Sequence, residues 1–343
     1  MPLDAVPAFP CFLSQIIAVI DLHIKYFSVL ILLFGKISFF IHSGFTFMRL
    51  LFLGSPDFAV PSLKALFDSK HTIVGVITQP DKPSGRGSQM QETPVKLFAK
   101  QHQIPVFTPD SCKTEEAKAL FKSLNFDLGV VVAYGNILPQ AILDIPPKGF
   151  INAHGSLLPK YRGAAPIMAP ILNGDSHSGI SIQKMVKKVD AGDVIASRSI
   201  PLEPTETTET LHDKLSILSA DLLLEVCNLI ENNQATFTPQ NESEATFVGK
   251  LNKEMGKINW SEPAIVIERK IRAFSPWPGT YCFAKIGNEL TRVKITKATI
   301  GQYEKNDIVP GKVLSPNSPA VTWTWFLRST KTSTSLRTPN SGK

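Results

Sequence analysis

The 343-residue sequence contains few cysteines and no cluster of them. Its four cysteines lie far apart in the chain, so the sequence predicts neither a metal site nor a disulfide framework: Cys11, Cys112, Cys227 and Cys282. A reducing compartment is therefore expected, and we predict a cytoplasmic protein that needs no metal. Internal repeats are also absent, so no repeat architecture is expected.

Residues 1–47 contain no arginine and no apolar run of the length that a bilayer requires. The run YFSVLILLFG ends at Lys36, whereas about 20 apolar residues are needed to span a membrane. The missing arginines and the early Asp4 are untypical of secretory and organelle-targeting signals. We therefore expect Met48 to be the working start, with residues 1–47 outside the fold and no stable membrane contact. A membrane anchor is the alternative.

The first strand–turn–helix pattern contains a single glycine. The apolar run RLLFLG ends at Gly54 and is followed by the helical spacing of SPDFAVPSLKALFDS. Because the Gly-x-Gly-x-x-Gly fingerprint is missing, NAD binding is not expected. Further apolar runs, HTIVGVIT, DLGVVVAYG and GFINAHG, alternate with helical segments. This alternation predicts an α/β fold with a Rossmann-like, mostly parallel sheet and helices on both faces.

A change in composition after the last long helical segment predicts a second domain. The polar stretch TPQNESEATF predicts a linker over residues 236–248, which separates a first domain over 48–235 from a second over 249–315. Short alternating segments and a hairpin signal at Gly287 predict a small, OB-like β-barrel in the second domain. The Ser- and Thr-rich residues 316–343 are expected to be disordered.

The charge of the chain is basic, and much of the excess lies in the second domain. Lysine and arginine number 36 against 29 acidic residues, a formal net charge of +7. Ten basic residues and four glutamates fall between Lys250 and Lys297. Such a surface favours a phosphate backbone as partner. The alternative is a solvated basic surface without a partner.

Polar side chains interrupt the apolar strand GFINAHG at Asn152 and His154. Side chains two residues apart on a strand point to the same face, about 7 Å from each other. A loop follows at once, and ligands of α/β sheets bind at the carboxyl ends of strands. An amide and an imidazole there can hold a developing oxyanion and move a proton, as acyl transfer requires. The alternative is a turn-capping asparagine and a histidine satisfied within the core.

A second polar cluster, KVDAGDVI, places Asp190 and Asp193 around a glycine before another predicted strand. A carboxylate at this point can orient an imidazole and help to remove a proton from an amine. The alternative is a turn with two solvated carboxylates.

Several segments occur in an order typical of one enzyme family: GSPDFAVPSL, TQPDKPSGRG, VVAYGNILP, FINAHGSLLPKYRGAAPI and DAGD. From about Met48 to about Leu314 the sequence closely resembles the methionyl-tRNA formyltransferases. The Asn-x-His, Ser-Leu-Leu-Pro and Asp-x-Gly-Asp elements are shared by the wider folate-dependent formyltransferases. The elements RGAAP and PWPG are typical of the tRNA enzymes in particular.

The resemblance implies transfer of a formyl group from 10-formyltetrahydrofolate to the α-amino group of methionine on initiator tRNA. It implies that Asn152, His154 and Asp190 are catalytic. It also implies a folate site formed by the segment after His154 and by a neighbouring strand end: Ser156, Leu157, Leu158, Pro159, Tyr134 and Gly135. For Tyr134 and Gly135, a strand end turned by glycine is the alternative.

The loop QPDKPSGRGSQMQETP resembles the inserted loop with which the family engages the acceptor end of tRNA, and Arg86 takes the position of its key arginine. Arg162 is expected to contact tRNA similarly or to hold its own loop. The basic second domain supplies further candidates for tRNA binding: Lys250, Arg269 and Arg272. We expect a monomer that binds folate and initiator methionyl-tRNA.

Two alternatives share the implied catalytic residues. A folate-dependent formyltransferase for a small amine, such as glycinamide ribonucleotide or an amino sugar, would have no use for a basic domain or an arginine loop. The other alternative is a catalytically impaired tRNA-binding homologue, because the segments before Met48 and after Leu314 do not match the family.

Overall fold

The computed structural model describes residues 47–84, 89–286, 288–300 and 325–326. The predictions about the segment before Phe47, about Arg86 and about most of the tail therefore lie outside the described residues.

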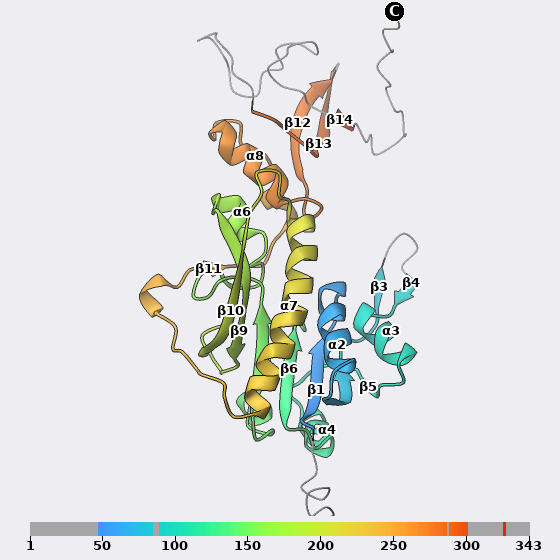
Figure 1. Cartoon of the computed structure of the whole chain (residues 1–343). Coiled ribbons are helices and arrows are strands. Elements are labelled where there is room, and N and C mark those ends of the chain that lie inside the picture. Colours follow the sequence, from blue (N-terminus) through green and yellow to red (C-terminus); the bar gives the residue numbers. More distant parts are fainter. Residues whose placement is uncertain (1–46, 85–88, 287, 301–324, 327–343) are drawn as a thin grey trace, which may run out of the picture. The chain divides into compact units, whose positions relative to one another are not determined.

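A seven-stranded sheet in the order β10-β9-β7-β6-β1-β2-β5 forms the centre of the molecule (Figure 1). Strands β5, β2, β1, β6 and β7 are parallel to one another, whereas β9 and β10 are antiparallel additions beside β7. The mostly parallel sheet predicted from the sequence is thus confirmed. Its strands span Arg49–Gly54 (β1), Thr72–Ile77 (β2), Val106–Phe107 (β5), Leu128–Val132 (β6), Phe150–His154 (β7), His177–Lys184 (β9) and Val194–Pro201 (β10).

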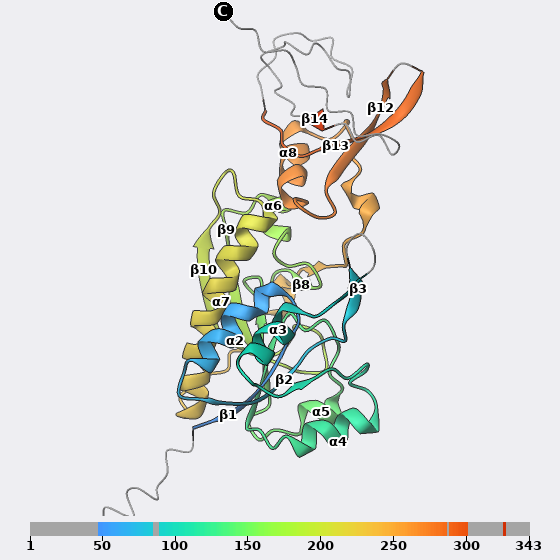
Figure 2. The same ribbon diagram turned by 90° about the vertical axis from the view of Figure 1, so that its right-hand side faces the viewer.

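Helices cover both faces of this sheet, because β1 is apolar on both sides. Leu50 and Phe52 belong to a core cluster with side chains of α2 and α7, whereas Leu51 and Leu53 pack in a second cluster with side chains of α4 and α5 (Figure 2). Burying each such side chain contributes about 1.5–3 kcal/mol. The helices span Val60–Phe67 (α2), Pro94–Gln101 (α3), Glu115–Ser123 (α4), Gln140–Leu143 (α5), Ala169–Asn173 (α6), Thr208–Glu231 (α7) and Ala264–Ala273 (α8).

Short elements lie between the strands and helices named above and in the segment that leads to the second domain. They are the 3-10 helices η1 (Asp57–Ala59), η2 (Glu242–Glu244) and η3 (Lys253–Gly256), the hairpin of β3 (Lys82–Ser84) and β4 (Gln89–Gln91), and the parallel pair of β8 (Arg162–Gly163) and β11 (Phe247–Val248). Both η2 and β11 fall in or next to the segment predicted to be a linker, which therefore carries structure of its own.

The second domain has a small core of its own, in which helix α8 contributes Ile267 and Ile271, β12 contributes Cys282 and β13 contributes Val293 and Ile295. Its described strands form a three-stranded antiparallel sheet of β12 (Thr280–Ile286), β13 (Glu289–Ile295) and β14 (Trp325–Phe326). The OB-like barrel therefore stays a prediction. Strand β14, which pairs with β13, lies within residues 316–343, where the sequence predicts disorder; for this tail disorder stays a prediction.

Within the part of the chain that the structure describes, no helix is long and apolar enough to cross a membrane.

Candidate active site

Strand β7 places Asn152 and His154 on one face of the sheet, as the period of a strand requires. Between them, Ala153 faces the opposite side and packs in the core. The antiparallel neighbour β9 places Gln183 opposite Asn152 and Ser181 opposite His154. Polar side chains from two strands thus meet near the carboxyl end of β7.

The imidazole of His154 is only 5% exposed and is held between two oxygen atoms. Its Nε2 lies 2.9 Å from the carbonyl oxygen of Tyr161. Because a carbonyl oxygen can only accept, Nε2 carries the hydrogen and donates it. Nδ1 then faces the carboxylate of Asp190, whose Oδ1 is 3.6 Å away.

The carboxylate of Asp190 accepts two further hydrogen bonds. The backbone N–H of Gly163 donates to Oδ2 and the side-chain amide of Gln183 donates to Oδ1, each over 2.9 Å. Asp190 itself has a left-handed backbone, with φ of 51°. These contacts hold both carboxylate oxygens of Asp190 in place beside the imidazole.

The amide of Asn152 differs from its neighbours. It is half-buried, and among the described residues its side chain has no hydrogen-bond partner. Its N–H groups are therefore available to an oxygen placed on this face of the sheet, at the distance of one strand repeat from His154.

The segment Ser156–Pro159, predicted to contact folate, forms the loop after β7. The hydroxyl of Ser156 donates to the carbonyl of Lys160 over 2.6 Å, and the N–H of Leu158 donates to the hydroxyl of Ser181 over 3.0 Å. Ser156 is buried, whereas Leu157, Leu158 and Pro159 are half-buried. The loop therefore has a fixed backbone and offers apolar side chains rather than polar ones.

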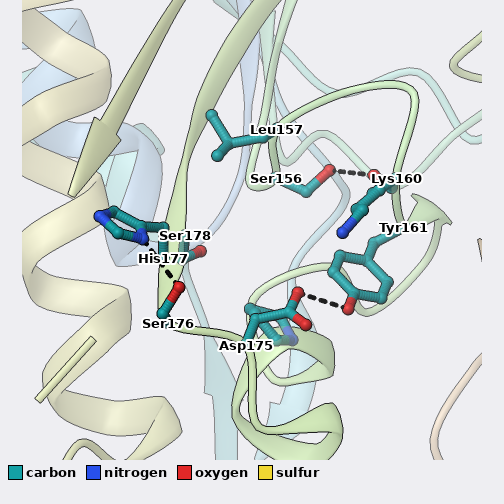
Figure 3. Close-up of a pocket in the computed structure, with 9 residues that line it drawn as sticks. Ser156, Leu157, Lys160, Tyr161, Asp175, Ser176, His177 and Ser178 are labelled. Carbon is teal, nitrogen blue, oxygen red and sulfur yellow. Dashed lines mark hydrogen bonds between the residues drawn. The ribbon is translucent and has the colours of Figure 1, made fainter. Parts of the chain in front are cut away.

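A pocket of about 200 Å³ lies between this loop, α6 and the start of β9 (Figure 3). In Figure 3 the phenol of Tyr161 donates to Asp175, over 2.6 Å. Burial and then this hydrogen bond raise the pKa of Tyr161 to about 12. Ser178 also lines the pocket, and its buried hydroxyl has no hydrogen-bond partner among the described residues.

Tyr134 is a core residue. Its side chain is 1% exposed, and its phenol pairs with the thiol of Cys112 over 3.3 Å. Burial raises the pKa of this phenol. Only the backbone of this strand end faces solvent: Gly135 is exposed with φ of 85°, and a Cβ there would lie 2.5 Å from the amide nitrogen of Gln79. The folate contact predicted for Tyr134 and Gly135 would therefore have to come from their backbone.

Arg162 has hydrogen-bond partners within the protein. Its side chain is 1% exposed, and its guanidinium donates to Gln240 and to Glu242. Hydrogen bonds from Arg162 and then from Lys188 lower the pKa of Glu242 to about 2. These partners hold the guanidinium inside the loop, which is the alternative expected for Arg162, and the tRNA contact stays a prediction.

The remaining predicted tRNA contacts differ in exposure. Lys250 is exposed. Arg269 is half-buried, with its guanidinium 3.4 Å from the carbonyl of Asn173. Arg272 is held by two hydrogen bonds to Glu268. Of these three cations, Lys250 is the most accessible.

Sequence reasoning missed two glutamines beside Asp190. Gln183 is 2% exposed and Gln240 is half-buried, and both bond to Asp190. The signal for Gln183 was a polar residue in the otherwise apolar strand pattern SGISIQKM. Gln240 carried no signal, because it lies in a stretch whose composition is that of a linker.

Comparisons with known proteins show which family the sequence matches. Residues 48–227 match the Formyl transferase family, and residues 250–321 match its C-terminal domain. The methionyl-tRNA formyltransferase of Alkaliphilus oremlandii is 47% identical over 267 residues, which cover 78% of this chain and 84% of the relative. That of Idiomarina loihiensis is 43% identical over 271 residues, which cover 78% and 85%.

Solved structures share the fold at low identity. A 4-N formyltransferase from Francisella tularensis has a TM-score of 0.58 and 20% identity, and the match covers 74% of this chain and 99% of that one. An N-formyltransferase from Helicobacter canadensis has a TM-score of 0.56 and 20% identity, over 76% and 93%. On the strength of the sequence relatives, the chain belongs to the methionyl-tRNA formyltransferase family of the formyl transferases.

Proposed function

We propose that the chain transfers the formyl group of 10-formyltetrahydrofolate to the α-amino group of methionyl-initiator tRNA, for translation initiation. The observation that carries the proposal is the amide of Asn152 beside the His154–Asp190 pair. Its close relatives bear the name of this activity.

The strand ends fit a folate. The backbone at Gly135 is exposed, so a flat heterocycle can approach it. The half-buried Leu157 and Leu158 offer apolar contact on the neighbouring loop. We propose that residues 156–159 and the backbone of residues 134–135 hold the formyl donor.

When bound, 10-formyltetrahydrofolate supplies the formyl carbon that the amine of methionine attacks. In this reaction the amide of Asn152 donates to the formyl oxygen as that oxygen gains negative charge. Asp190 accepts the proton that the amine loses as the new C–N bond forms. His154 keeps this carboxylate in place, because its ring is held between Tyr161 and Asp190, and Asp190 passes the accepted proton to the leaving nitrogen as the old C–N bond breaks.

The outer face of the β12–β13 hairpin suits an RNA backbone. Arg292 lies 3.7 Å from the centre of the Tyr281 ring, and Lys257 lies 5.9 Å from that of Phe283, which is 47% exposed. Of the two rings only that of Phe283 is open to a base, because Tyr281 is 5% exposed; an exposed ring beside a cation supports stacking and phosphate contact together. We propose that this face, with Lys250, binds the tRNA, and that Arg86 contacts the acceptor end.

The same proposal includes a cytoplasmic monomer. It also includes a catalytic domain over residues 48–235 and a tRNA-binding domain over 249–315, with the rest of the chain outside both.

Formyl transfer by the purified full chain tests the function. Charged initiator tRNA, free methionine and an amino-sugar nucleotide serve as parallel acceptors. We expect a formylated product on the tRNA alone, with a KM for tRNA that rises with salt because phosphate contacts release counterions. Transfer to the small amine, or to no acceptor while the tRNA still binds, contradicts the proposal.

A further inference from the structure

We propose that residues 238–248, here called the strap, position the His154–Asp190 pair, with Gln240 as the residue that fixes Asp190. This inference rests on the proposed formyl transfer and deepens it, because it gives the segment between the two domains a part in the catalytic site.

The strap is attached at both ends to the first domain. In Figure 1 it leaves the end of α7 and returns past β9 and β10 to β11, which is its last part. At its start, Thr238 and Val194 exchange two backbone hydrogen bonds of 2.9 Å. At its end, Val248 pairs with Gly163, where a Cβ would lie 2.2 Å from the carbonyl oxygen of Val248. The backbones therefore approach this closely only because residue 163 is a glycine.

The orientation of the Gln240 amide is fixed by Arg162. The guanidinium donates to Oε1 of Gln240 from Nε over 3.0 Å and from Nη2 over 2.8 Å. Because a guanidinium has no acceptor, the oxygen of the amide must face it. The nitrogen of the amide then faces the turn around Asp190, where it donates to the carbonyl of Gly192 over 2.7 Å and to that of Asp190 over 3.0 Å.

The hydrogen bonds keep the same donor-to-acceptor direction from Gln240 through Gln183 to the carboxylate of Asp190. Nε2 of Gln240 also lies 3.3 Å from Oε1 of Gln183, so the nitrogen of Gln183 is turned toward Asp190. That nitrogen donates to Oδ1 over 2.9 Å. Each amide in this chain of contacts therefore has one permitted orientation, and the chain ends on the oxygen that faces Nδ1 of His154.

The other end of the strap holds the carbonyl partner of His154. The hydroxyl of Thr246 accepts from the N–H of Tyr161 over 2.8 Å, and its carbonyl accepts from the N–H of Arg162 over 2.9 Å. Tyr161 has an unfavourable left-handed backbone, with φ of 62°, so these bonds help to keep its carbonyl aimed at Nε2 of His154. One segment thus supports the contacts of both ring nitrogens.

The variant Gln240→Glu tests the role of the amide nitrogen. Glutamate keeps the size of the side chain and an oxygen that Arg162 can bind, but it cannot donate to Asp190 or Gly192. We expect kcat of the full chain to fall by about 10- to 100-fold, because a catalytic group is displaced, while the KM for each substrate stays within about 3-fold. The matched control is Lys188→Ala, which removes the exposed lysine that pairs with Glu242 and leaves Gln240 in place. It should keep the original kcat.

A double variant separates positioning from a general loss of structure. If Gln240 acts through Asp190, adding Gln240→Glu to Asp190→Asn should lower kcat by less than about 2-fold, because coupled residues are not additive. A double variant whose loss in kcat equals the product of the two single losses overturns the proposal. So does an unchanged kcat for Gln240→Glu alone.

The imidazole NMR signal of His154, assigned through His154→Gln, gives a readout that needs no activity. It should move in Gln240→Glu and stay in place in Lys188→Ala. If it moves while the unaltered chain transfers no formyl group, the positioning role stands and the proposed function fails. An unmoved signal in Gln240→Glu overturns the positioning role itself.

Discussion

The His154–Asp190 side of the proposed catalytic site differs from the Asn152 side in the number of hydrogen bonds that its polar groups already make with the protein. On one side, both carboxylate oxygens of Asp190 accept hydrogen bonds and Nε2 of His154 donates to a carbonyl. On the other side, the amide of Asn152 has no side-chain partner among the described residues. The pair that we propose to handle protons is therefore oriented before any substrate arrives, whereas the amide of Asn152 is available to bond the substrate.

This difference has a consequence for stability. Replacing a group that the protein engages leaves its buried partners unsatisfied, which costs free energy of unfolding as well as rate. Replacing a group that only a substrate engages costs rate alone. Variants on the two sides can therefore be told apart by measuring both quantities.

The largest effect is expected for Asp190→Asn. The new amide group must point its nitrogen toward Gly163 or Gln183, each of which is itself a donor. We expect kcat to fall by about 10³-fold or more and the free energy of unfolding by about 1–3 kcal/mol. Steady-state kinetics and urea unfolding measure the two. A variant as stable as the unaltered chain would show that the bonds to Asp190 contribute nothing to the fold.

Asn152→Ala should lose rate only. Removing one donor to an oxyanion typically costs about 10²- to 10³-fold in kcat, and no protein contact of this amide is lost. The unfolding temperature is expected to stay within about 2 °C of the original. A clear drop in that temperature would mean that Asn152 supports the fold, and the contrast between the two sides would disappear.

Arg162→Lys and Lys250→Ala extend the comparison to the basic residues. Lysine cannot reproduce the paired contacts of Arg162 with Gln240 and Glu242, so we expect a loss of about 1–3 kcal/mol in stability and an unchanged KM for tRNA. Lys250→Ala should leave stability alone and raise the KM for tRNA several-fold. Unfolding curves and tRNA titrations of both variants test this, and a raised KM in Arg162→Lys would instead support a tRNA contact of Arg162.

The smallest effect concerns His71, a buried histidine outside the site. Burial and then, more weakly, Lys70 lower its pKa below 6.5, against the opposing effects of Glu231 and Asn228. The unfolded chain therefore binds more protons than the folded chain just below pH 6.5, so the free energy of unfolding falls as the pH drops through this range. Urea unfolding between pH 5 and 8 should show a shallower slope in His71→Gln. An equal slope would assign the effect to other groups.

Local pattern was enough to predict the groups that the sheet itself places. Asn152 and His154 share a face because side chains alternate along a strand. They belong to the last residues of β7, which is parallel to β6, so they lie at the edge of the sheet where the parallel strands end. Asp190 follows from the turn that leads into β10. The central sheet was predictable for the same reason, since its apolar runs must be covered on both faces.

The environment of each charged side chain was not predictable in this way. Arg162 meets Gln240 at a distance of 78 residues in the sequence, and nothing local to either residue indicates the other. The sequence therefore left two roles open for Arg162, a contact with tRNA or a part in holding its own loop. Burial of that guanidinium depends on tertiary contacts alone.

The most direct test of the account is single-turnover formyl transfer to charged initiator tRNA by the unaltered full chain and by a variant that combines Asn152→Ala, His154→Gln and Asp190→Asn. We expect rapid transfer by the unaltered chain. The combined variant should be about as slow as the slowest single variant, because residues that act as a unit are not additive, and it should still bind tRNA. A combined variant that forms formylated tRNA within about 10-fold of the original rate would contradict the central claim that these three residues carry the chemistry.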